Sequence, residues 1–111
     1  MRERTYKGFL ILDLDNDGDN YTSFEKAVEK IRSLPTFNEQ KYYSGFFDDA
    51  LLWFNCDGID IKLEYSGFMG TELKVDENLD RIKLQKVRQW AEQIYKAIHE
   101  NETPMEYMLL P

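Results

Sequence analysis

The stretch Ala50–Val75, ALLWFNCDGIDIKLEYSGFMGTELKV, decides the fold class of this 111-residue chain. It begins with a continuous apolar run at Ala50–Asn55, which is typical of a central strand. The Asp57-Gly58 pair that follows is favoured in tight hairpin turns. Over Ile59–Tyr65, apolar and polar residues then alternate with the period of a half-buried strand. We therefore expect a β-hairpin centred on the Asp-Gly pair.

The pattern continues beyond this hairpin. Ser66–Gly70 predicts a second turn, and alternation resumes with inward residues at Thr71, Leu73 and Val75. The stretch therefore predicts a meander of at least three antiparallel strands with one apolar face. The opposite face is expected to carry a charged array of Asp60, Lys62, Glu64, Glu72 and Lys74.

Two amphipathic helices are expected on either side of the meander. The first starts at Thr22, where Thr22-Ser23-Phe24-Glu25 matches the capping box, and Pro35 ends it. The second runs from about Asp80 to about Glu100, because its apolar residues fall on one stripe at about 100° per residue. These stripe residues are Leu84, Val87, Trp90, Ala91, Ile94, Tyr95 and Ile98.

Thr5–Leu14 is interpreted as one strand, apolar on both faces and so interior to a sheet. The polar and aromatic segment between the first helix and Ala50 is interpreted as a loop. The resulting order, β-α-β-β-β-α, predicts a single α+β domain over residues 1–111, with two helices on one face of a mostly antiparallel sheet. The apolar tail Thr103–Pro111 either docks on this domain or adds an edge strand.

The net charge of −7 bears on the kind of partner. Residues 41–80 hold nine acidic groups against three basic ones, so the acidity is concentrated in the middle of the chain. Nucleic acids and anionic membranes select positive surfaces, which argues against both as partners. A negative surface instead favours a basic protein or a cation, and it accelerates association with the former.

Two further features favour a cytoplasmic protein. Cys56 is the single cysteine, so an intramolecular disulfide is excluded. No stretch approaches the roughly 18 apolar residues of a membrane span, and the N-terminal residues lack the pattern of a secretory signal.

We expect no catalytic residues and predict that the protein is not an enzyme. The chain contains no phosphate-binding glycine loop, no nucleophile elbow and no histidine-rich metal spacing. His99, the single histidine, falls near the end of the second helix, where an imidazolium suits the helix dipole. Cys56 has no base near it in the sequence and is expected to be a small, half-buried residue.

The segment Asp13–Asp19, DLDNDGD, resembles the opening of an EF-hand calcium loop. The resemblance ends after seven residues, because the twelfth position is Phe24 and Glu25 comes one residue late. The segment is therefore either a Ca²⁺ site or an acidic turn that caps the first helix. The candidate metal ligands are Asp13, Asp15, Asp17 and Asp19.

Aromatic rings among carboxylates have the composition of a protein-binding hot spot. The candidate partner-binding carboxylates are Asp48, Asp49, Asp57, Asp60, Glu64 and Glu72, and the candidate aromatic anchors, expected in loops, are Tyr42, Tyr43, Phe46 and Phe68. Trp53, Phe54 and Tyr65 are instead expected in the core. Asp48 and Asp49 also leave acid–base catalysis open, although neighbours in an extended segment point in opposite directions.

In size, acidity and α+β architecture, the chain resembles the immunity proteins of bacterial toxin systems, of the contact-dependent-inhibition and polymorphic-toxin type. The resemblance implies a stoichiometric inhibitor that binds a cognate toxin, often a basic nuclease, and occludes its active site. The alternative function is a cation- or small-ligand-binding module built on the Asp13–Asp19 loop. The sequence determines neither the identity of the partner nor the oligomeric state.

Overall fold

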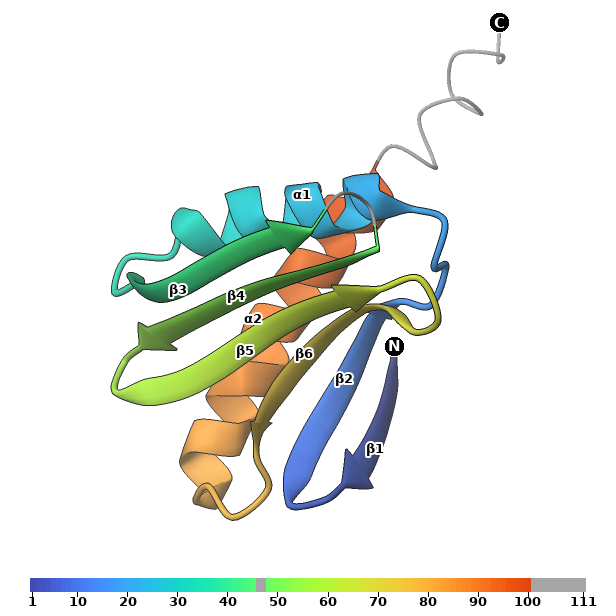
Figure 1. Ribbon diagram of the computed structural model, residues 1–111. Coiled ribbons are helices and arrows are strands. Elements are labelled where there is room, and N and C mark those ends of the chain that lie inside the picture. Colours follow the sequence, from blue (N-terminus) through green and yellow to red (C-terminus); the bar gives the residue numbers. More distant parts are fainter. Residues whose placement is uncertain (46–47, 101–111) are drawn as a thin grey trace, which may run out of the picture.

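The computed structural model describes residues 1–45 and 48–100, which form an antiparallel sheet covered by helices (Figure 1). The expected α+β class is confirmed. The six strands are β1 (Arg2–Tyr6), β2 (Phe9–Asp15), β3 (Asn38–Gly45), β4 (Asp49–Cys56), β5 (Ile59–Ser66) and β6 (Gly70–Asp76), and the two helices are α1 (Tyr21–Arg32) and α2 (Arg81–His99). The strands are ordered β1-β2-β6-β5-β4-β3 across the sheet.

The predicted meander is confirmed and is longer than expected. Strands β4 and β5 pair around the Asp57–Gly58 turn, where both residues have positive φ, 53° and 77°. Strands β5 and β6 pair around the second turn, which joins Ser66 to Gly70. Every second residue of these strands is buried, as the alternation predicted.

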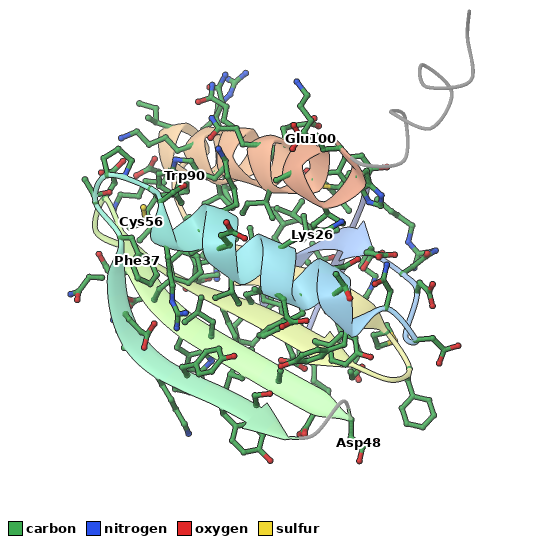
Figure 2. The ribbon with its side chains drawn as sticks, turned by 90° about the horizontal axis from the view of Figure 1, so that it is seen from above. Lys26, Phe37, Asp48, Cys56, Trp90 and Glu100 are labelled. Carbon is green, nitrogen blue, oxygen red and sulfur yellow. The ribbon has the colours of Figure 1, made fainter. Side chains whose placement is uncertain are left out.

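Both helices pack on the same face of the sheet, as expected, and they lie together above it in Figure 2. The core beneath them joins α1 and α2 to the inward residues of β2, β4, β5 and β6. The expected core residues Phe54 and Tyr65 are each 1% exposed. Helix α2 begins as predicted, because the Asp80 carboxylate accepts a hydrogen bond from the backbone N–H of Lys83 at 2.9 Å. We call the uncovered side of the sheet the open face.

The prediction of one strand over Thr5–Leu14 is wrong, because the chain turns back at Lys7 and Gly8. These two residues have positive φ, 50° and 86°, and connect β1 to β2. Lysine rarely occupies the left-handed region, so the usual Asn-Gly or Asp-Gly signal is missing. The prediction of an interior position is confirmed for β2, which lies between β1 and β6, whereas Thr5 and Tyr6 belong to the edge strand β1.

The segment that precedes Ala50 is not the expected loop, because it contains edge strand β3. Its residues are exposed on both faces, so no apolar alternation marks it in the sequence. Tyr42 and Tyr43, predicted in a loop, are therefore strand residues. The element order is β-β-α-β-β-β-β-α.

The predicted capping box of α1 does not form. The helix starts at Tyr21, and its N-cap residue Asn20 makes no side-chain capping bond. The Ser23 hydroxyl instead donates to the Asp15 carboxylate at the end of β2. A tertiary contact thus replaces the local capping bond that the sequence suggested.

Neither described helix is both long and apolar enough to cross a membrane. Phe46 and the tail Thr103–Pro111, about which the sequence led to predictions, lie outside the described residues.

Candidate functional site

Two connections and the start of a strand meet at one end of the sheet, on the right of Figure 1. They are the β2–α1 loop, the β5–β6 turn and residues 48–49 at the start of β4. We call this surface, residues 15–20, 48–49 and 66–70, the acidic loop end. Its carboxylates are Asp15, Asp17, Asp19, Asp48 and Asp49.

These three segments are joined by hydrogen bonds. The Gly67 N–H donates to the Asp48 carbonyl at 3.1 Å, which ties the β5–β6 turn to the start of β4. The Tyr65 hydroxyl donates to the Gly18 carbonyl, which ties the β2–α1 loop to β5. Gly18 also lies so close to Gly67 that a Cβ there would collide with the Gly67 carbonyl. The surface is therefore preorganised, which lowers the entropy cost of binding.

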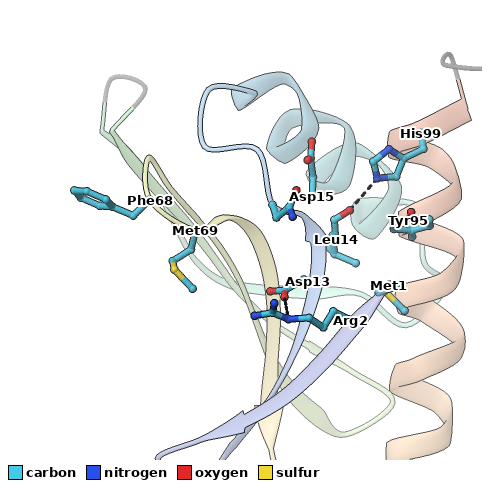
Figure 3. Close-up of a pocket in the computed structure, with 10 residues that line it drawn as sticks. Met1, Arg2, Asp13, Leu14, Asp15, Phe68, Met69, Tyr95 and His99 are labelled. Carbon is cyan, nitrogen blue, oxygen red and sulfur yellow. Dashed lines mark hydrogen bonds and ion pairs between the residues drawn. The ribbon is translucent and has the colours of Figure 1, made fainter.

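Two large apolar side chains project from this end. Phe68 is 97% exposed and Met69 is 44% exposed. In Figure 3, the Phe68 ring points away from the body of the protein. An exposed aromatic ring on a fixed turn is the kind of side chain that anchors protein interfaces.

The charge of this surface is uncompensated. None of its five carboxylates forms a salt bridge with a lysine or arginine in residues 1–45 or 48–100. The negative potential reaches the Tyr65 hydroxyl beneath it. Burial raises the pKa of Tyr65, and the carboxylates of Asp19, Asp17 and Asp48 raise it further.

The carboxylates of the β2–α1 loop are used to fold the loop itself. Asp15 accepts hydrogen bonds from the Asp17 backbone N–H at 3.0 Å and from the Asn20 side chain at 3.2 Å. Asp17 in turn accepts from the Asp19 backbone N–H at 2.9 Å. Asp13, the fourth candidate metal ligand, is on the open face and pairs with Arg2 at 3.2 Å.

The part of the chain that the structure describes contains no group of three or more acidic, histidine or cysteine side chains placed to hold a metal ion. The geometry therefore gives no support to the predicted Ca²⁺ site at Asp13, Asp15, Asp17 and Asp19. The segment is an acidic turn leading into α1, as in the alternative, but it provides no side-chain capping bond; the Asp15 carboxylate joins the turn to the Ser23 side chain of the helix.

A hollow of about 270 Å³ lies beside the acidic loop end, between the β5–β6 turn and α2 (Figure 3). Met69 and Phe68 line one side, and Tyr95 and His99 line the other. The Nε2 atom of His99 lies 2.9 Å from the Leu14 carbonyl, at hydrogen-bonding distance. His99 thus links the end of α2 to β2, a role in folding that its place in the sequence did not indicate.

On the open face, the predicted partner-binding carboxylates are engaged within the protein. Glu64 Oε2 lies 3.0 Å from Lys62 Nζ and 3.5 Å from Lys74 Nζ. Burial raises the pKa of Glu64, but the two ammonium groups outweigh burial and hold the pKa below its ordinary value. Its negative charge is therefore already compensated.

Glu72 is the most enclosed of these carboxylates, with a side chain 4% exposed. It forms a salt bridge with Arg4 and lies opposite Asp13 in the register of β2 and β6. Burial and the hydrogen bond with Asp13 raise the pKa of Glu72 to about 7, although the positive charges of Arg4 and Lys74 act in the other direction. In this conformation Glu72 is closed to a partner.

The remaining predicted residues are dispersed. Asp57 is at the far end of the sheet and pairs with Lys86 at 3.3 Å. Asp60 accepts from the amides of Asn55 and Gln40, at 3.0 and 3.1 Å, on the open face.

The two predicted tyrosines lie on opposite faces of edge strand β3. Tyr42 contacts the Arg32 guanidinium, 5.1 Å from the ring centroid, on the α1 side, whereas Tyr43 is 48% exposed opposite Leu51. Of the predicted partner residues, the structure therefore gathers Asp48, Asp49 and Phe68 at the acidic loop end.

Sequence reasoning missed several exposed apolar residues. Trp53 was expected in the core but is 42% exposed on the open face, because its neighbours Leu52 and Phe54 point inward. In a strand that alternates from an inward Leu52, Trp53 falls on the open face. Tyr6 and Phe9, 59% and 44% exposed, were hidden because the β1–β2 turn was not recognised.

No protein-family model matches the chain, and comparisons with curated proteins and with solved structures found no match. The case for function therefore rests on the geometry of the acidic loop end and of the open face.

Proposed function

We propose that this protein is a non-catalytic binding protein that neutralises a basic protein partner through the acidic loop end. The proposed activity is that of the immunity proteins of bacterial toxin systems, which are small acidic domains that block the active site of a toxin in the cytoplasm. One observation carries it: five carboxylates that form no salt bridge with a lysine or arginine of the described chain lie at the same end of the sheet as Phe68, which is 97% exposed.

The two features of this surface have separate roles in binding. Lysine and arginine side chains on the partner are steered toward the carboxylates, which raises the association rate. Phe68 supplies an apolar anchor that enters a pocket on the partner and slows dissociation. A phosphate-binding active site, as in a nuclease, offers the positive charge that this surface complements.

The fixed backbone of this end supports the same role. The hydrogen bonds from Gly67 and Tyr65 hold the β2–α1 loop, the β5–β6 turn and the start of β4 in one arrangement before binding. Little conformational entropy is then lost when the partner docks. The carboxylates of Asp48 and Asp49 are exposed and near the anchor, so they are the charges that we expect to contact the partner.

The test begins with capture of bound proteins from the native organism at low and high salt, in calcium or in chelator. The captured protein is then purified, and its affinity is measured for wild type, Phe68→Ala and Phe9→Ala. Phe9 is a matched control, since it is a 44% exposed ring on the open face. We expect Phe68→Ala to weaken binding by roughly 30-fold or more, the range of a hot-spot residue, and Phe9→Ala to leave it unchanged.

Calcium and chelator should give the same affinity. The proposal fails if no stoichiometric basic partner is captured under any condition, or if both phenylalanine variants weaken binding equally. Binding that requires calcium would instead support a cation-dependent module.

A further inference from the structure

The open face holds a hollow of about 340 Å³ that is separate from the acidic loop end. Phe9 on β2 and Trp53 on β4 form its two walls. Three strand spacings separate their strands, about 14 Å. The side chains of Ile61 and Val75 are buried on the helix side, so these two residues line the hollow with main chain and form its floor.

Positive charge gathers at one side of this hollow. Lys62 and Lys74 are directly opposite one another in the register of β5 and β6. Like charges in such a position destabilise a sheet. Both lysines form a salt bridge with the same carboxylate, that of Glu64.

A third ammonium group adjoins the same wall. Lys41 Nζ lies 5.6 Å from the centroid of the Trp53 ring, and Lys62 Nζ lies 5.9 Å from it. Lys41 forms no salt bridge with a carboxylate in the described ranges. Lys41 and Lys62 therefore flank the Trp53 ring, and Glu64 is the counter-charge of Lys62 and Lys74 alone.

Two aspartates also line the hollow, and their hydrogen bonds go to groups other than the lysines. Asp60 accepts from the neutral amides of Asn55 and Gln40. Asp76 accepts from the backbone N–H of Asn78 at 2.8 Å. Neither aspartate forms a salt bridge with Lys62 or Lys74, so Glu64 is the carboxylate in direct contact with this lysine pair.

We propose that this hollow binds a small organic molecule with a planar apolar ring and one anionic group. The ring lies between Phe9 and Trp53, where it stacks on aromatic surface that is otherwise exposed to water. The anionic group lies beside Lys62 and Lys74 and gives this pair a second negative charge in contact, in addition to the Glu64 carboxylate that the two lysines share. This site is independent of the acidic loop end, and either proposal can fail without the other.

Three naphthalene probes that differ in charge test the proposal: naphthoate, naphthylmethanol and naphthylmethylamine. Each is titrated into the full-length protein while backbone and indole N–H signals are followed by NMR. We expect naphthoate to shift the signals of Phe9, Trp53, Lys62 and Lys74. It should bind about tenfold tighter than the neutral alcohol, as one charge-assisted contact provides, and the amine should bind weakest.

Two variants extend the test. Lys74→Gln and Lys62→Gln should each remove the preference for naphthoate over the alcohol, while Lys96→Gln, an exposed lysine on α2, should keep it. The NMR spectrum of each variant reports directly whether its fold is intact. Equal binding of naphthoate and the amine, shifts located away from the open face, or an unchanged preference in both lysine variants would overturn the proposal.

Discussion

At the acidic loop end five carboxylates lack a basic partner in the described chain, whereas on the open face Glu64 and Glu72 each contact a cation. Carboxylates paired within the protein have their charge compensated there and offer little charge to a partner. Unpaired carboxylates repel one another, which lowers stability slightly. Such a cost is expected where the groups are used for binding. The difference implies that neutralising Glu64, which two lysines hold ionised, should cost stability, whereas neutralising a carboxylate of the acidic loop end should not.

The largest effect on stability is expected for Arg4→Met. Arg4 is a 25% exposed side chain that forms a salt bridge with Glu72, and its loss leaves a buried carboxylate beside Asp13. We expect a loss of about 2 kcal/mol at pH 8, since removing one member of a largely buried pair is costly. The loss should be smaller at pH 5, because Glu72 then takes up a proton. Urea unfolding at both pH values measures this, and equal losses would contradict the account.

Glu72→Gln should change how stability depends on pH. The pKa of Glu72 is raised from its ordinary 4.5 to about 7 in the folded protein, so folding favours the protonated form. The contribution of this group to stability is fully present below pH 4.5 and is lost as the pH rises through 7. Glutamine mimics the protonated side chain and should retain that contribution at pH 8.

The measurement is the difference in unfolding free energy between wild type and Glu72→Gln from pH 4 to pH 8. The variant should become increasingly more stable than the wild type as the pH rises. Glu92→Gln, an exposed helix residue, is the control and should give a constant difference. If the difference for Glu72→Gln is also constant, Glu72 does not take up a proton in the folded protein between pH 4.5 and 7, and the prediction is wrong.

The smallest effects on stability compare Glu64→Gln with Asp48→Asn. Glu64 contacts two lysines, so its neutralisation should cost about 0.5–1 kcal/mol, the upper range for a part-exposed ion pair. Asp48 has no described basic partner, so its neutralisation should leave stability within about 0.5 kcal/mol or increase it. Thermal unfolding of the two variants in parallel measures both. A larger loss for Asp48→Asn would reverse the distinction between the two regions.

The fold was predictable where local chemistry and tertiary structure agree. Asp57-Gly58 matches the turn that the hairpin requires, and the apolar stripe of the second helix matches the side of α2 that is buried. The turn at Lys7-Gly8 was missed, because lysine disfavours positive φ. Strand β3 was missed, because an exposed edge strand shows no apolar alternation.

The candidate site was only partly predictable for a related reason. The sequence identified Asp48, Asp49 and Phe68 as residues suited to a partner, but not that they adjoin the loop containing Asp17 and Asp19. That proximity depends on long-range contacts such as the bond from Tyr65 to Gly18. Ion pairing depends on register as well, since the arginine that holds Glu72 comes from the unrecognised strand β1. Residue types were therefore readable from the sequence, whereas their availability to a partner was not.

The most direct test of the account is the salt dependence of association with the captured partner. The association rate is measured across a range of ionic strength for wild type, for Asp48→Asn/Asp49→Asn and for Glu29→Gln/Glu92→Gln, which removes the same charge from the exposed faces of the helices. The account predicts that the loop-end variant associates about tenfold more slowly at low salt and with a weaker salt dependence, while the helix variant stays close to wild type. Equal slowing in the two variants would show that net charge alone steers binding and would contradict a specific role for the acidic loop end.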